Sequence, residues 1–218
     1  MKEAILKYFI SDFHFGHEDI LDFERTQFKT IKEHDDHIEN CLRHWASYLK
    51  EEDELWVLGD WGDISNLNIM DLFKCHTVFV YGNHDKQNDY EQFFTHFDQV
   101  YLYSTFIDKR IAVSHTPIAV YDDTVNIHGH LHGAIIDKPN YITCSINDTQ
   151  YHLVSEKDIQ NLFSKMKKYD RRFLYEPFCK DYVYTNHAQR KDLICDKNGK
   201  VDIAATKALR EFINRYNK

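Results

Sequence analysis

The sequence has few of the residues that break a chain or cross-link it. Only 7 glycines and 3 prolines occur among 218 residues, so no stretch has the composition of a flexible linker. The five cysteines are odd in number and widely spaced, which argues against a disulfide framework and against a zinc ribbon. They indicate reduced thiols and hence a cytoplasmic protein.

Long apolar runs are also missing from the sequence. No stretch approaches the roughly 20 apolar residues that a membrane-spanning helix needs, so no membrane partner is expected. The opening stretch MKEAILKYFI is interrupted by Lys7 and lacks a small-residue cleavage site, which favours a buried strand over a signal peptide. With 43% hydrophobic and 15% aromatic residues, the chain has the composition of a globular protein with a sizeable core.

Charge is distributed unevenly along the chain. Residues 1–154 contain 12 basic and 26 acidic residues, whereas residues 155–218 contain 15 basic and 9 acidic residues. Anionic ligands are therefore attracted to the C-terminal part and repelled by much of the rest. Bound metal ions would reverse that repulsion locally.

Five short apolar runs predict buried strands of an α/β fold: AILKYFI, LWVLGD, HTVFVYGNHD, RIAVSH and VNIHGH. A helix is expected over residues 30–50, where Thr30 and Glu33 form a capping-box pattern, and helices are also expected over 65–75 and 88–97. Each apolar run leads into Asp, Asn or His. Because ligands of α/β sheets bind beyond the carboxyl ends of strands, these polar residues are expected to converge.

The polar residues have the chemistry of a metal site. They comprise carboxylates, imidazoles and one amide without any cysteine, which suits Mn²⁺, Fe or Zn²⁺ better than an ion selected by thiolates. They are too numerous for one tetrahedral ion, whereas two ions that share a bridging carboxylate would use them all. The residues are Asp12, His14, Asp60, Asn83, His84, Asp85, His115, His130 and His132.

The order of the motifs is more informative than any one of them. D-x-H, G-D, G-N-H-D, a single His and G-H-x-H follow one another, and in this order the chain resembles the calcineurin-like metallophosphoesterase family over roughly residues 4–163. The stretches SDFHFGHEDI, GNHD and IHGHLHG are most similar to its small bacterial and phage branch. The resemblance implies a metallophosphoesterase domain over residues 1–163, built as a sandwich of two mixed β-sheets flanked by helices.

The resemblance also implies two divalent metal ions, for which Mn²⁺ is preferred over Fe, Zn²⁺ or Ni²⁺. The ligands of the first ion are then Asp12, His14 and His132. The ligands of the second ion are then Asn83, His115 and His130.

Three further roles follow from the same resemblance. Asp60 bridges both ions, His84 protonates the leaving oxygen beside the substrate phosphate, and Asp85 orients His84 through a hydrogen bond. A carboxylate suits a bridge because its two oxygens can face two cations. A histidine suits proton donation because an imidazole titrates close to neutral pH.

These roles predict a metal-dependent phosphoesterase that uses a bridging hydroxide at a di-metal centre. A phosphodiesterase acting on a nucleotide or nucleic-acid-related substrate is favoured, because a proton donor such as His84 matters most for a poor leaving group. A phosphomonoesterase and a non-catalytic scaffold with the same fold remain as alternatives. The sequence does not indicate the oligomeric state.

Other residues near the motifs are open to two interpretations. His17 either reaches the substrate phosphate or supports a ligand, or it simply begins a helix, and we favour the helix start. Arg25 is either a phosphate clamp or, as we favour, a solvated side chain. His128 has no role in the family pattern, so we expect it at a strand edge or behind the ligands and expect it to tolerate replacement best of the three histidines in IHGHLHG.

Residues 164–218 form the predicted basic C-terminal extension, with a helix, a hairpin turning at Asn198–Gly199 and a second helix. Residues 164–184 interleave basic and aromatic side chains, which permits binding of single-stranded nucleic acid. We favour an amphipathic lid or a dimer contact, because aromatic stripes usually serve packing. The sequence assigns no role to this extension.

Overall fold

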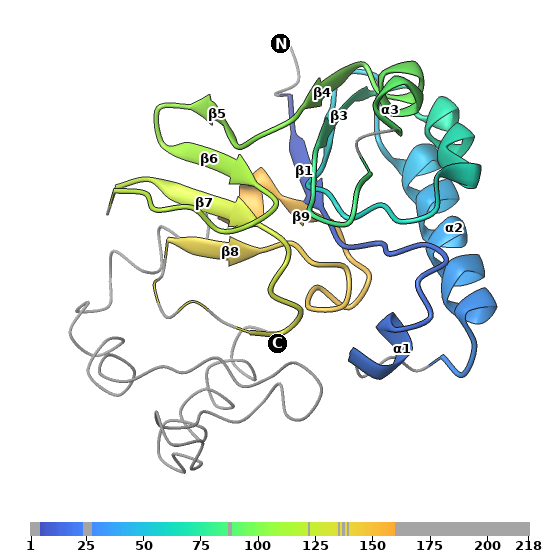
Figure 1. The fold of residues 1–218 in the computed structure, drawn as a ribbon. Helices are drawn as coiled ribbons and strands as arrows, with labels where there is room; N and C mark the ends of the chain where they lie inside the picture. The colour runs from blue at the N-terminus through green and yellow to red at the C-terminus, as the bar shows by residue number, and fades with distance from the viewer. Residues whose placement is uncertain are drawn as a thin grey trace, which may run out of the picture.

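Two mixed β-sheets lie face to face in the computed structural model, which describes residues 5–23, 28–86, 89–121, 123–134, 136, 138 and 140–159 (Figure 1). The first sheet has the order β4 (Gln99–Tyr101), β3 (His76–Val80), β2 (Glu54–Val57), β1 (Lys7–Ile10) and β9 (Val154–Ser155). The second has the order β5 (Thr105–Asp108), β6 (Ile111–Ser114), β7 (Val125–His128) and β8 (Tyr141–Thr143). The helical segments are α1 (Ile20–Phe23), α2 (Ile31–Tyr48), η1 (Ile64–Leu72) and α3 (Tyr90–His96), and residues 156–159 are also helical.

The predicted α/β class with two mixed sheets and helices is confirmed. Strands β1 to β4 pair in parallel and β9 pairs antiparallel with β1. In the second sheet β6, β7 and β8 are parallel and β5 is antiparallel. Parallel neighbours deliver their carboxyl ends to one edge of a sheet, which is where the polar motifs begin.

The alternation of side chains along each strand separates two layers of core. Phe9 and Trp56 pack in the cluster between the sheets, together with Val113 and Ile127 from the second sheet. Their neighbour Ile10 points the other way, into the cluster that α2 and η1 cover. Because both faces of the first sheet are buried, its strands read as continuous apolar runs rather than as alternating patterns.

Helix α2 covers the outer face of the first sheet, with α3 and η1 on the same side (Figure 1). Its predicted start is confirmed, because the Thr30 hydroxyl accepts a hydrogen bond from the Glu33 N–H at 3.2 Å. The Glu33 carboxylate accepts from the N–H of Lys29 rather than from that of Thr30. Both bonds satisfy N–H groups at the helix start that have no partner within the helix.

The remaining differences from the sequence prediction are local. All five predicted strands are present as β1, β2, β3, β6 and β7, but the expected helix over 65–75 is the 3₁₀ segment η1. Strands β4, β5, β8 and β9 were not predicted, because they have two to four residues and are half-buried or exposed. The C-terminal extension, Arg25, Cys179 and Cys195 lie outside the described residues. Among the residues that are described, no helix combines the length and apolarity needed to cross a membrane.

The cysteines of the core are expected to be chemically inert in the folded protein. Burial raises the pKa of Cys75 to about 11 and moves that of Cys144 further upward, so almost no thiolate exists at neutral pH. We expect both to resist iodoacetamide at pH 7.5 and to react fully in urea, as measured by peptide mass spectrometry. Alkylation of Cys144 in the native protein at the rate of a free thiol would contradict its burial.

Candidate metal centre

The segments that follow strands of both sheets bring the polar motifs together. Among the described residues, three groups have donor atoms no more than 4.8 Å apart: one is His14, His17 and His84, and the other two, the first and second groups, share Asp60. The first group is Asp12, His14, Asp60 and His132. The second group is Asp60, His115 and His130. Asp60 therefore belongs to both groups, which is the arrangement expected of a carboxylate shared by two cations.

Hydrogen bonds beyond the strand ends fix the loops that carry these groups. The N–H of Asp12 donates to the carbonyl of Gly59 at 3.0 Å, and the N–H of His14 donates to the carbonyl of Asp60 at 2.9 Å. The carboxylate of Asp12 accepts from the Ser11 hydroxyl at 2.5 Å and from the N–H of His130 at 2.9 Å. The carboxylate that follows β1 is thus tied directly to the loop that follows β7.

The second group is ordered around His115, which is 4% exposed. Its Nδ1 lies 2.8 Å from the carbonyl oxygen of Leu58 and donates to it, so Nε2 is the ring nitrogen that faces the cluster. Nε2 lies 2.9 Å from Asn83 Oδ1 and 3.2 Å from Asp60 Oδ2. A backbone carbonyl on one ring nitrogen is the usual way in which a protein aims the other at a metal ion.

The two oxygens of Asp60 have different surroundings. Oδ1 accepts a hydrogen bond of 2.9 Å from the backbone N–H of His84. Oδ2 is fully buried and has no hydrogen-bond partner among the described residues, although His14 Nε2 and His115 Nε2 lie 3.4 Å and 3.2 Å away. From the sequence we expected one oxygen of Asp60 to face each cation, whereas in the structure the same oxygen, Oδ2, faces both groups.

The spacing of the donor atoms fits divalent cations. Two ligand atoms held about 2.1 Å from one ion lie about 3.0–3.4 Å apart at octahedral or tetrahedral angles. His14 Nε2 lies 3.2 Å from His132 Nε2 and 3.4 Å from Asp60 Oδ2. Buried nitrogens facing one another beside an orphaned carboxylate oxygen are costly unless a cation lies between them. The residues present therefore fit divalent metal ions.

Backbone strain is concentrated on the same residues. The structure describes seven residues other than glycine with positive φ, and five of them belong to the predicted ligand set: Asp12, His14, Asp60, His130 and His132. Their φ angles lie between 44° and 70°, in the left-handed region that such residues rarely adopt. Strain of this kind persists only where the surrounding structure enforces it, and it gathers at functional sites.

Glycines allow the loops to approach one another this closely. A Cβ on Gly59, whose φ is 84°, would lie 2.5 Å from the backbone nitrogen of Gly82. A Cβ on Gly82 would in turn collide with the carboxylate of Asp60. The glycines of G-D and G-N-H-D thus serve close packing around the bridging residue.

Burial and mutual charge set the protonation of the cluster. Burial lowers the pKa of His14 to about 3, against the effect of Asp12 and Asp60. Burial alone would raise the pKa of Asp60, but the close approach and charge of His115, with the charge of His14, hold it well below its usual range. Burial also lowers the pKa of His115, but Asp60 and Asp12 outweigh it and raise that pKa to about 9. His14 and Asp60 are thereby in the unprotonated forms that metal ligands require, whereas His115 is protonated near neutral pH without a cation and must release that proton to bind one.

Asp85 has a different set of partners from the one expected. Its carboxylate accepts hydrogen bonds from the backbone N–H groups of Asp60, Trp61 and Gly82, at 2.9, 2.9 and 2.7 Å. No described hydrogen bond joins it to the ring of His84. The structure therefore gives Asp85 the task of holding the loops after β2 and β3 together, and the proposed contact with His84 stays a prediction.

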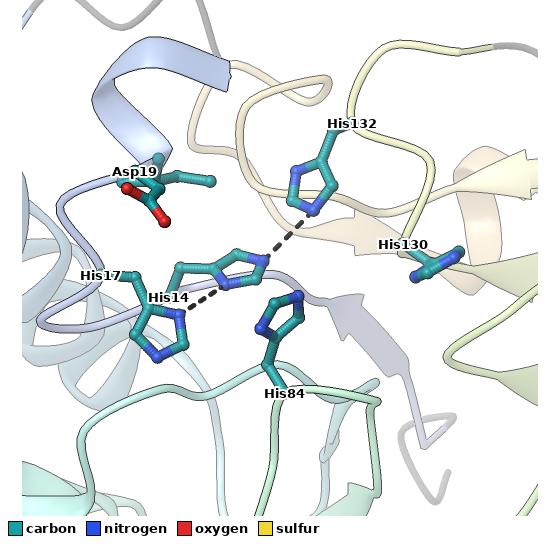
Figure 2. Close-up of a pocket in the computed structure, with 7 residues that line it drawn as sticks. His14, His17, Asp19, His84, His130 and His132 are labelled. Atoms are coloured by element: carbon teal, nitrogen blue, oxygen red, sulfur yellow. Dashed lines mark hydrogen bonds between the residues drawn. The ribbon is translucent and has the colours of Figure 1, made fainter. Parts of the chain in front are cut away.

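His84 lies at the mouth of the site. Its side chain is exposed and lines a pocket of about 450 Å³ beside the first group (Figure 2). The ring of His84 meets that of His14 nearly edge-on, with centroids 5.0 Å apart. Because His84 holds Asp60 through its backbone, its side chain remains available to a bound ligand.

Of the two positions that the sequence suggested for His128, the structure excludes the strand edge. It is 2% exposed and belongs to β7, which is flanked by β6 and β8. The expectation of a strand-edge residue is wrong, because the polar residue faces a buried layer and its Nδ1 donates to the carbonyl of Gly129 at 2.9 Å. Its burial also argues against the expected tolerance to replacement, since truncation would empty part of the interior.

Three residues of the pocket were not assigned to it from the sequence. Asp19 and Ile20 line it from the start of α1, and His17 lies beside His14 and His84 (Figure 2). Helix α1 begins at Ile20, and the carbonyl of His17 already accepts from the Ile20 N–H at 3.0 Å, so His17 leads into the helix and also lines the pocket. The signal for His17 was the H-x-G-H spacing of FHFGH, because glycine in a four-residue turn brings its ends together.

The chain is similar to two proteins whose names assign them no activity. It is 26% identical over 177 residues to the uncharacterized protein MJ1445 of Methanocaldococcus jannaschii, an alignment that covers 73% of this chain and 92% of that protein. It superposes on the crystal structure of AQ665 from Aquifex aeolicus, a protein of unknown function, with a TM-score of 0.58 and 26% identity, covering 73% of this chain and 100% of that one. These likenesses support the fold and carry no activity with them.

A more distant likeness is to a structure described as a novel archaeal phosphodiesterase. The TM-score is 0.41 with 16% identity, over 65% of this chain and 82% of that one. The activity in that description is that protein's own. No model of a known protein family matches the chain.

Proposed function

We propose that this chain is a calcineurin-like metallophosphoesterase, of the small bacterial and phage type, that hydrolyses phosphodiesters with two divalent cations. The observation that carries the proposal is Asp60 Oδ2, a buried anionic oxygen without a hydrogen-bond partner among the described residues that lies between the two groups of candidate ligands. The ordered motifs of the sequence are the second support, because all of them are intact. Mn²⁺ is the preferred ion, and Asn83 joins the second group through the oxygen that faces His115.

The chain's own residues would divide the chemistry among them. Two divalent cations in the site would neutralise phosphoryl oxygens and make water a competent nucleophile near neutral pH. Asp12, His14 and His132 would hold one of them and Asn83, His115 and His130 the other. His84 would then bind the phosphate at the pocket mouth and give its proton to the leaving oxygen.

The pocket lining favours a diester over a monoester. Its described lining is five histidines, one aspartate and one isoleucine, without lysine or arginine. A monoester carries a second negative charge, which proteins commonly match with an arginine or lysine. A diester carries a single negative charge, which the cations and imidazoles can balance. The carboxylate of Asp19 would repel the additional negative charge of a monoester.

The natural substrate is proposed to be a nucleotide or a nucleic-acid fragment. The basic composition of residues 155–218 supports this, because these residues would attract polyanions to an otherwise acidic chain. We further propose that the metallophosphoesterase domain ends near residue 163 and that residues 164–218 form an extension of their own.

The proposal is tested with metal-free protein reconstituted with Mn²⁺, Fe²⁺, Zn²⁺ or Ni²⁺. Hydrolysis of bis(4-nitrophenyl) phosphate is expected with at least one ion, at a kcat/KM well above that for 4-nitrophenyl phosphate. Cyclic nucleotides, dinucleotides and single strands then define the substrate. No activity with any ion would make the fold a scaffold, and faster cleavage of the monoester would overturn the diester assignment.

A further inference from the structure

A tight turn after β1 brings the side chains of His14 and His17 next to each other. The N–H of His17 donates to the carbonyl of His14 at 3.1 Å, and Gly16 between them has a φ of 71°. The N–H of Gly16 donates to the carboxylate of Asp35 in α2 at 3.0 Å, and the side chain of Phe15 is 1% exposed. The turn is therefore held from the helix and from the core, so the relative position of the two imidazoles is set by the fold.

The two rings of the turn meet through their Nδ1 atoms. His14 Nδ1 lies 3.1 Å from His17 Nδ1, while His14 Nε2 faces His132 Nε2 at 3.2 Å (Figure 2). The ring of His14 thus has one nitrogen directed at the candidate metal group and the other at His17. His17 is itself half-buried, and its Nδ1 is at hydrogen-bonding distance from a ring that is 3% exposed.

If His14 binds a cation, this determines which ring nitrogens of His14 and His17 carry protons. A histidine that binds a cation through Nε2 must carry its proton on Nδ1. The Nδ1–H of His14 then donates to His17 Nδ1, which accepts only if His17 is neutral and carries its own proton on Nε2. A partner on the far ring nitrogen fixes the tautomer and the orientation of a metal-binding histidine.

We propose that His17 is a positioning residue for the first metal ion, which it stabilises by accepting a hydrogen bond from His14. The partner of a metal-binding histidine is usually a carboxylate, a carbonyl or water, and here a second imidazole from the same turn takes that place. The proposal rests on the proposed metal centre. It assigns no contact with the substrate to His17, although the ring lies 5.5 Å from that of His84.

Two substitutions of His17 distinguish the effect of its hydrogen bond to His14 from the effect of its side chain filling space. His17→Asn places an amide oxygen close to the position of the imidazole Nδ1, so it retains an acceptor for His14. His17→Ala removes the acceptor at a half-buried position. His44→Asn, at an exposed position on α2, serves as the matched control. Mn²⁺ and Co²⁺ binding is measured by calorimetry and chelator competition, and circular dichroism checks the fold.

The expected result is a selective loss at one of two metal sites. In His17→Ala the affinity of one ion falls about 10- to 100-fold while the other is retained, and in His17→Asn and His44→Asn both affinities stay within about threefold. At saturating metal, His17→Ala is expected to recover a kcat within a few-fold of the unsubstituted protein.

Three results would overturn the proposal. They are unchanged affinities in His17→Ala, an asparagine variant as weak as the alanine variant, or a kcat that saturating metal does not restore. The last of these would place His17 against the substrate instead. A failure of the metal centre itself is distinguishable, because the unsubstituted protein would then bind no ion.

Discussion

Replacing Asp60 with asparagine is expected to empty the metal centre while leaving the fold intact. The amide oxygen of the introduced asparagine would still accept the His84 N–H, but an uncharged NH₂ group would replace the Oδ2 atom that lies between His14 and His115. An NH₂ group has no lone pair for a cation and carries no charge. Because both groups share this oxygen, both ions should be lost together.

The loss of metal affinity expected for Asp60→Asn is larger than the loss expected from replacing any residue that acts on the ions only indirectly. Indirect partners of ligands are worth about 10- to 100-fold in metal affinity, so Asp60→Asn should lower it by more than about 100-fold. Metal content after desalting is measured by mass spectrometry, with circular dichroism as the check on folding. Asp63→Asn is the matched control, since asparagine also caps η1 well. Retention of both ions by Asp60→Asn would contradict the bridging role.

Replacing His84 with alanine is expected to separate catalysis from metal binding. The contact of His84 with Asp60 is made by its backbone N–H, which alanine keeps. Both ions should therefore remain, while diester turnover falls by about 10²- to 10⁴-fold, the range typical for loss of a general acid.

The leaving group provides an internal control for this variant. A nitrophenolate leaves without a proton, whereas an alkoxide needs one, so His84→Ala should impair alkyl diesters more than nitrophenyl diesters. Steady-state rates on both substrates, with metal content measured in parallel, check this. An equal loss on both substrates, or a loss of metal, would show that His84 is not a proton donor.

The strands and the candidate site were predictable for different reasons. Strands such as β2 and β3 are buried on both faces, which leaves an apolar run in the sequence that packing then uses. The site was predictable as a set, because G-D or S-H alone means little and only their order after successive strands points to one place. Asp12 and His132 are far apart in the sequence, yet their side chains belong to one group of candidate ligands.

The sequence could not show which atoms of the site residues contact which partners. Asp85 was expected to orient His84, and the sequence does not reveal that its carboxylate accepts three backbone N–H groups. The same holds for Asp60, where one oxygen rather than two faces the donors. The strand-edge position expected for His128 was wrong because β7 lies between β6 and β8, an order of strands that no local pattern encodes.

The central claim is that two cations share the Oδ2 atom of Asp60. The most direct measurement is an anomalous difference map from crystals of the Mn²⁺-loaded protein, collected at the manganese absorption edge. We predict two peaks, each about 2.2 Å from Asp60 Oδ2, one on the side of His14 and His132 and the other on the side of His115 and His130. A single peak, or peaks that do not touch Asp60, would contradict the claim.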